Sequence, residues 1–92
     1  MTREERNPKW AADVRLRKVR GELLLAGNTE VYKLTEVAAD IWQLADGTRS
    51  VAEIATALTE RYDVPEDTAL RDVRALMDEL DQARLLTWVS RR

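Results

Sequence analysis

Residues 22–35 read ELLLAGNTEVYKLT, and this stretch decides the fold. Its first five residues include three consecutive leucines, which is typical of a strand that is buried on much of both faces. Gly27 and Asn28 follow, and both residue types tolerate the positive φ angles that a tight hairpin requires. From Glu30 to Leu34, the strand period places Tyr32 and Leu34 on one face and Val31 and Lys33 on the other. The stretch therefore predicts two antiparallel strands joined by a short turn.

A third strand is predicted upstream of this hairpin. From Val14 to Val19 the strand period places Val14, Leu16 and Lys18 on one face and Arg15, Arg17 and Val19 on the other, and Gly21 ends the run. The three strands together predict a β-meander. Residues 1–12 show no clean periodicity, and Pro8 disfavours a helix there, so we expect a flexible basic arm followed by one domain over residues 13–89.

Two helices are predicted downstream of the hairpin. Thr35 can cap the first helix, whose apolar residues follow helical spacing until Asp46 and Gly47 stop it. Ser50 and Glu53 form a capping box that starts the second helix, because each side chain can bond the backbone amide of the other residue.

A third helix is predicted from Pro65 to about Arg84, since proline is tolerated in a first turn and acidic residues follow it. Leu85 to Val89 is expected to form a short tail or strand, with Trp88 as its anchor. The order of elements predicts an α+β domain of winged-helix-like architecture, in which a three-stranded antiparallel meander precedes a three-helix bundle.

The composition excludes most catalytic chemistry. The chain has 92 residues, with no histidine and no cysteine, so histidine acid–base catalysis, cysteine nucleophiles and ordinary zinc sites are absent. Ser50 is already explained as a helix cap, and the three glycines are too far apart to form a phosphate-binding loop. We therefore expect no enzyme activity, no catalytic residue, no metal and no cofactor.

The likeness to winged-helix proteins raises a nucleic-acid-binding alternative. Residues 1–20 carry seven basic and three acidic groups, although the whole chain has a net charge of −2. The third helix, where DNA-binding winged helices usually read DNA, carries more acidic than basic residues and would repel phosphates. Nucleic acid is thus disfavoured as a partner. No run of residues is long and apolar enough to cross a bilayer, so the expectation is a cytoplasmic protein.

The third helix has an apolar face that is wider than a simple core stripe. Ala69, Val73, Leu76, Leu80 and Ala83 share one stripe, and Leu70 and Met77 lie on one shoulder of it. Two interpretations stay open at this point. The shoulder either completes the core under the sheet or forms the floor of a binding groove.

Several stretches together resemble the PqqD family, the small chaperones of pyrroloquinoline quinone biosynthesis and their relatives, which are also called RiPP recognition elements. The resemblance covers nearly all of residues 14–88 and rests on VYKLT at 31–35, AADIW at 38–42, DGTRSVAEI at 46–54, Asp72 with Val73, and Leu85 with Leu86. Two departures from the family pattern are Thr35, where asparagine is common, and Arg84, where glycine is common.

The resemblance implies binding of the leader segment of a ribosomally made precursor peptide and its presentation to a modifying enzyme, often a radical-SAM protein and otherwise a peptidase or cyclase. In this family the leader adds as a strand beside the third strand of the meander and lies against the third helix. Carried onto this sequence, the expected peptide-binding residues are Glu30, Val31, Tyr32, Lys33 and Leu34 on the strand and Leu70, Arg74, Met77 and Asp81 on the helix. A winged-helix nucleic-acid-binding protein, a docking scaffold for partner enzymes and a homodimer stay open as alternatives.

Overall fold

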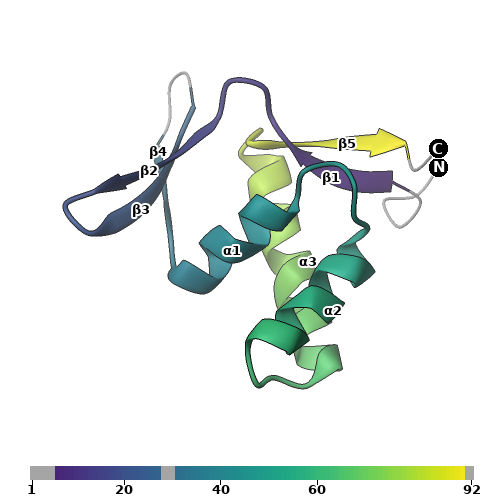
Figure 1. Cartoon of the computed structure of the whole chain (residues 1–92). Helices are drawn as coiled ribbons and strands as arrows, with labels where there is room; N and C mark the ends of the chain where they lie inside the picture. Colours follow the sequence, from purple (N-terminus) through teal and green to yellow (C-terminus); the bar gives the residue numbers. More distant parts are fainter. Residues whose placement is uncertain (1–5, 28–30, 91–92) are drawn as a thin grey trace.

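In a computed structural model of the chain, the structure describes residues 6–27 and 31–90. Two small antiparallel sheets and three helices make up this part (Figure 1). In chain order the elements are β1 (Arg6–Trp10), β2 (Arg15–Val19), β3 (Glu22–Ala26), β4 (Val31–Leu34), α1 (Glu36–Leu44), α2 (Val51–Arg61), α3 (Glu66–Gln82) and β5 (Leu86–Ser90). The predicted α+β class and the order of meander and helices are confirmed.

The predicted meander is the sheet β2-β3-β4, with both pairs antiparallel. Arg20 and Gly21 form the turn between β2 and β3, with φ angles of 52° and 83°. Two consecutive residues with positive φ give the turn geometry whose twist matches that of paired strands. Asn28, expected in the second turn, lies outside the described residues.

The helix boundaries follow the capping signals in the sequence. Thr35 accepts a hydrogen bond from the Ala38 amide at the start of α1, and Ser50 and Glu53 form the predicted capping box at the start of α2. Pro65 precedes α3 without a side-chain cap. Arg84 follows this helix with a φ of 61°, the left-handed conformation in which glycine is common.

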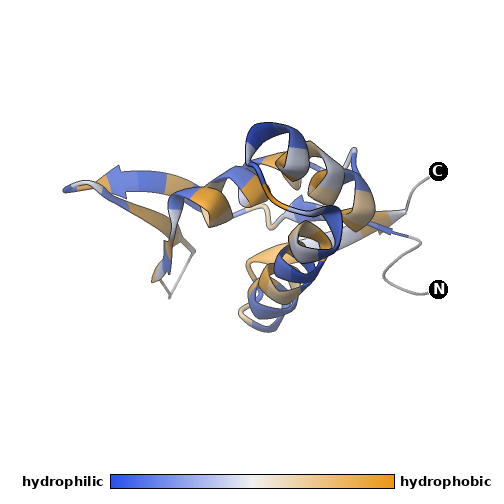
Figure 2. Cartoon of the chain, turned by 90° about the horizontal axis from the view of Figure 1, so that it is seen from below, coloured by the Kyte–Doolittle hydropathy of each residue, from blue (hydrophilic) through white to orange (hydrophobic). Residues whose placement is uncertain are grey.

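The core lies among the three helices, β5 and the inner face of the meander. Its fully buried side chains include Leu25 of β3, Ile54 of α2, and Val73, Met77 and Leu80 of α3. The meander extends to one side of the helices, beyond α1, in both views (Figures 1 and 2). Only its inner face is covered, as antiparallel sheets allow.

The expectation of a loose arm is wrong for residues 6–10. They form β1, which pairs antiparallel with β5 from Arg6 opposite Ser90 to Trp10 opposite Leu86. Asn7 and Pro8 are buried, and the Trp10 ring stacks on Trp42 of α1 with 5.2 Å between ring centroids. The Leu85 to Val89 stretch, expected as a tail or strand, contributes most of β5.

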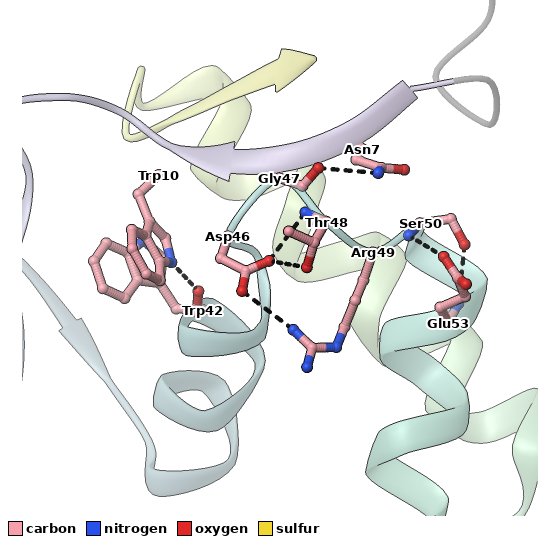
Figure 3. A network of polar contacts seen from close by, with 9 residues as sticks. All are labelled: Asn7, Trp10, Trp42, Asp46, Gly47, Thr48, Arg49, Ser50 and Glu53. Atoms are coloured by element: carbon pink, nitrogen blue, oxygen red, sulfur yellow. Dashed lines mark hydrogen bonds and ion pairs between the residues drawn. The ribbon is translucent and has the colours of Figure 1, made fainter. Parts of the chain in front are cut away.

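The connection between α1 and α2 holds β1 in place (Figure 3). The Gly47 amide donates to the Pro8 carbonyl at 3.0 Å, and the Asn7 side-chain amide donates to the Gly47 carbonyl at 3.0 Å. Gly47 has a φ of 93°, and a side chain there would approach Lys9 to 3.2 Å. The connection that follows α1 therefore also binds β1, through the backbone of Gly47.

No helix in the described ranges is both long and apolar enough to cross a membrane.

Candidate functional site

The first component of the site is an edge strand. Within the described part of the chain, β4 pairs only with β3, so its other edge has unpaired backbone amides and carbonyls. Val31 to Leu34, four of the five residues expected on the strand side of the site, form β4, while Glu30 lies outside the described residues. An exposed edge of this kind can accept an extended peptide as an additional strand.

The side chains of β4 alternate between the two faces of the meander. Leu34 is buried and Tyr32 is half-buried on the inner face, whereas Val31 is 66% exposed on the outer face. Lys33 is also exposed and pairs with Glu22 of β3 at 2.7 Å, which raises the pKa of Lys33. This pairing leaves Lys33 less available for an acidic group on a ligand.

Tyr32 connects the inner face of β4 to α3. Its hydroxyl donates a hydrogen bond to a carboxylate oxygen of Glu79. That hydrogen bond, reinforced by partial burial and by the negative charge of Glu79, raises the pKa of Tyr32. The contact identifies the flank of α3 that is turned toward the edge strand.

A surface hollow of about 420 Å³ lies between this flank of α3 and the start of α1. Val37, Ala38 and Ile41 supply apolar surface from α1, and Ala75 and Leu76 supply it from α3. Asp72, Glu79 and Thr35 add polar groups to the lining. We name this hollow the α1–α3 groove. It can accept an apolar side chain of a segment that runs along β4, with carboxylates nearby for a basic neighbour.

The residues of α3 expected in the site lie elsewhere on the helix. Met77 is fully buried in the core, so its side chain offers no surface to a peptide in this structure. Leu70 is half-buried against the core, and Arg74 and Asp81 are exposed. At about 100° per residue, Leu70, Asp81 and Arg74 lie about 120°, 140° and 160° around the helix from Leu76, so these three residues belong to the flank away from the α1–α3 groove.

The α3 side of the groove is formed by Asp72, Ala75, Leu76 and Glu79, none of which the sequence predicts as a peptide-binding residue. Leu76 had been assigned to the core stripe. In the structure the buried residues of α3 are Ala69, Val73, Met77 and Leu80, and Leu70 and Leu76 each lie about 60° from the centre of this stripe, on opposite shoulders. Periodicity alone cannot decide which shoulder faces the strand.

The described residues contain no group of three or more acidic, histidine or cysteine side chains that could hold a metal ion. The raised pKa values of Tyr32 and Tyr62 have a simple structural cause, since each hydroxyl donates to one carboxylate, from Glu79 and Asp40 respectively. These contacts link neighbouring elements.

Comparison with known families agrees with the geometry. Residues 22–86 match the family described as Coenzyme PQQ synthesis protein D (PqqD). The chain belongs to the PqqD family. The family resemblance stated from the sequence is thus confirmed, and the match contains β3, β4 and all three helices.

Among curated relatives of this PqqD-family chain, the PqqA binding protein of Xanthomonas axonopodis pv. citri (strain 306) is 38% identical over 88 residues, which cover 94% of this chain and 95% of the relative. The PqqA binding protein of Rhizobium meliloti (strain 1021) is 34% identical over 80 residues, covering 85% and 82% of the two chains. Both relatives are described as binding proteins.

Two solved structures share the fold. TbiB1 in complex with the TbiA(beta) leader peptide matches with a TM-score of 0.73 and 26% identity, covering 85% of this chain and 93% of TbiB1. The PqqD truncation of Methylobacterium extorquens PqqCD, described as a functional and stand-alone RiPP recognition element, matches with a TM-score of 0.72 and 28% identity over 87% of each chain.

Proposed function

We propose that this PqqD-family chain binds the leader segment of a ribosomally made precursor peptide as an additional strand on the edge of β4. The observation that carries the proposal is the free edge of β4 beside the α1–α3 groove. The strand edge supplies backbone hydrogen bonds to the peptide, and the groove gives specificity because it accepts only some of the peptide's side chains. The relatives named PqqA binding protein and the leader complex of TbiB1 support the same function.

The proposal assigns the peptide-binding surface to β4 and to the flank of α3 that carries Asp72, Leu76 and Glu79. Burying an apolar leader side chain between Val37 and Leu76 supplies affinity, because removing apolar surface from water is favourable. The carboxylate of Glu79 is held by Tyr32 and faces the same space. A leader that presents a basic residue next to its apolar anchor would satisfy both components.

In this proposal the chain performs no chemistry on the peptide. It presents the bound precursor to a modifying enzyme, for which we propose a radical-SAM protein, in the cytoplasm where precursor peptides are translated. A strand held on a sheet edge leaves the rest of the peptide free to enter another active site. The chain thereby raises the effective concentration of substrate near that enzyme.

Titration of the ¹⁵N-labelled chain with the PqqA peptide of Xanthomonas axonopodis pv. citri tests this function by NMR. We expect amide shifts concentrated in residues 31–34 and 72–79, because added backbone hydrogen bonds and groove contacts change those environments. A peptide of the same composition in scrambled order serves as the control and should give no such shifts. Absence of shifts with PqqA, or shifts confined to residues 15–19, would refute the assignment.

A further inference from the structure

The meander has a second free edge, formed by β2. The strand order is β2-β3-β4, and within residues 6–27 and 31–90 the only partner of β2 is β3. In an antiparallel pair, alternate residues direct their amide and carbonyl groups away from the partner strand. The outer edge of β2 therefore has a row of unpaired backbone groups, on the side of the meander opposite the proposed leader strand.

Cationic side chains surround this second edge on both faces of the sheet. Arg15 and Arg17 project from one face and Lys18 from the other, and all three are exposed. None of them forms an ion pair with a carboxylate in the described part of the chain, in contrast to Lys33 of β4, which pairs with Glu22. Val19 adds an exposed apolar surface at the end of the strand, with 46% of its area accessible.

We propose that the β2 edge binds an extended acidic segment of a partner protein as an added strand. The unpaired backbone row requires a partner with its own amides and carbonyls, and the flanking cations require carboxylates on that partner. Opposite charges across strands are stabilising, while like charges directly opposite each other are destabilising. A strand with alternating acidic and apolar residues satisfies both requirements.

The charges of β2 exclude another copy of the same edge as the occupant. Antiparallel pairing of two β2 strands would place arginine and lysine side chains against one another, a known protection against edge-to-edge aggregation. Duplex DNA would satisfy the cations but would leave the backbone row unpaired. The acidic protein strand is the occupant that uses both features.

The β2 site goes beyond the proposed leader site and does not depend on it. Strand β3 separates β2 from β4 in the sheet, so the two edges can be occupied at the same time. The meander also extends to one side of the helices (Figure 1). A partner enzyme with an acidic edge segment could bind here while the leader occupies β4.

The test uses three blocked heptapeptides and NMR titration of the whole ¹⁵N-labelled chain. The first is Ac-Glu-Val-Glu-Val-Glu-Val-Glu-NH2, the second has the same sequence with N-methylated valines, and the third has lysine in place of glutamate. We expect the first peptide to shift the amides of residues 15–19. The N-methylated peptide should bind at least about tenfold more weakly, because it keeps the charge but loses the strand hydrogen bonds.

Two matched double variants test the contribution of charge. Arg15→Gln with Arg17→Gln should weaken binding of the acidic peptide by roughly fivefold or more, since each removes one facing cation. Arg61→Gln with Arg71→Gln makes the same change in net charge on the helices and should leave the affinity unchanged. Circular dichroism melting verifies that both variants are folded.

Three results would overturn the proposal. The first is equal affinity for the methylated and unmethylated acidic peptides, which would show that charge alone is recognised. The second is an absence of shifts at residues 15–19 with the acidic peptide. The third is tighter binding of a twelve-base-pair DNA duplex than of the acidic peptide, which would assign the cations to nucleic acid.

Discussion

The three helices, together with the sheet of β1 and β5, form a helical body. This body and the meander differ in how much of their apolar side-chain surface is buried. In the body, Ile54, Val73, Met77 and Leu80 are completely buried, and β1 and β5 close over one side of the helices. In the meander only Leu25 reaches that degree of burial, and Val31 on its outer face is 66% exposed. The body therefore supplies most of the apolar burial, which is the main favourable term in folding.

The meander has less of its surface buried, but within residues 6–27 and 31–90 both of its edge strands keep an unpaired side. A sheet closed on all sides could not add a strand, so its incomplete cover is what a strand-adding function requires. We therefore expect stability and recognition to depend on different side chains, although the α1–α3 groove belongs to the helical body. Substitutions in the body should change unfolding, and substitutions at the edges and groove should change binding.

Met77→Ala should have the largest effect on folding. Met77 is fully buried among the helices, so its truncation leaves a cavity and should lower the free energy of unfolding by about 2–5 kcal/mol. Urea unfolding followed by circular dichroism measures this loss. The exposed Val31→Ala substitution in the meander is the control and should cost less than about 0.5 kcal/mol.

An effect of Met77→Ala on peptide binding and not on stability would contradict the assignment of Met77 to the core. If the variant unfolded at the same urea concentration as the unchanged chain but lost affinity for PqqA peptide, Met77 would be a groove residue. That result would restore the groove interpretation of the helix shoulder that carries Leu70 and Met77.

Trp10→Ala should have an intermediate effect and tests whether β1 belongs to the body. Trp10 stacks on Trp42 and its indole nitrogen donates to the Trp42 carbonyl, although 36% of the residue is exposed. We expect a loss of about 1–3 kcal/mol of unfolding free energy, below that of a fully buried tryptophan. The exposed neighbour Lys9→Ala gives the baseline. A flexible arm would instead predict no difference between the two variants.

Asp46→Asn should have the smallest effect and should depend on pH. The Thr48 hydroxyl, with smaller contributions from the Thr48 amide and Arg49, holds the pKa of Asp46 below its usual value despite partial burial. A lowered pKa in the folded state means that ionised Asp46 stabilises the fold above the unfolded pKa of about 3.9, and that this stabilisation disappears as pH falls through the folded pKa.

Urea midpoints at pH 7 and pH 3 measure this linkage. The unchanged chain should lose more stability between the two pH values than Asp46→Asn does, and the exposed Asp63→Asn variant should behave like the unchanged chain. Equal losses for the unchanged chain and Asp46→Asn would show that the connection between α1 and α2 contributes nothing to the pH dependence.

Local signals account for the elements that the sequence predicted correctly. The alternating pattern before Leu34 specified the meander, and Thr35 and the Ser50–Glu53 capping box specified where two helices begin. Strand β1 had no such signal, because its residues RNPKW do not alternate and contain a proline. Its partner β5 lies about eighty residues away, and long-range pairing leaves no local pattern.

The residues of the candidate site on β4 were predictable from a local alternating pattern. The residues on α3 were not. The sequence places Leu76 in the core stripe and Leu70 on its shoulder, but the tertiary arrangement buries Met77 instead and turns Leu76 toward α1. The peptide-binding roles of Leu70, Arg74 and Asp81 stay predictions. The proposed role of Leu76 also stays a prediction. Leu70 and Leu76 form a matched pair of variants for one experiment.

The affinity of Leu76→Ala and Leu70→Ala for the PqqA peptide of Xanthomonas axonopodis pv. citri, measured by calorimetry, tests the account most directly. Both leucines are half-buried on α3 and lose the same atoms, so a difference in affinity reports which flank contacts the peptide. We predict that Leu76→Ala weakens binding by about tenfold or more, as truncation of an interface anchor does, and that Leu70→Ala binds like the unchanged chain. Weaker binding by Leu70→Ala with unchanged binding by Leu76→Ala would contradict the account.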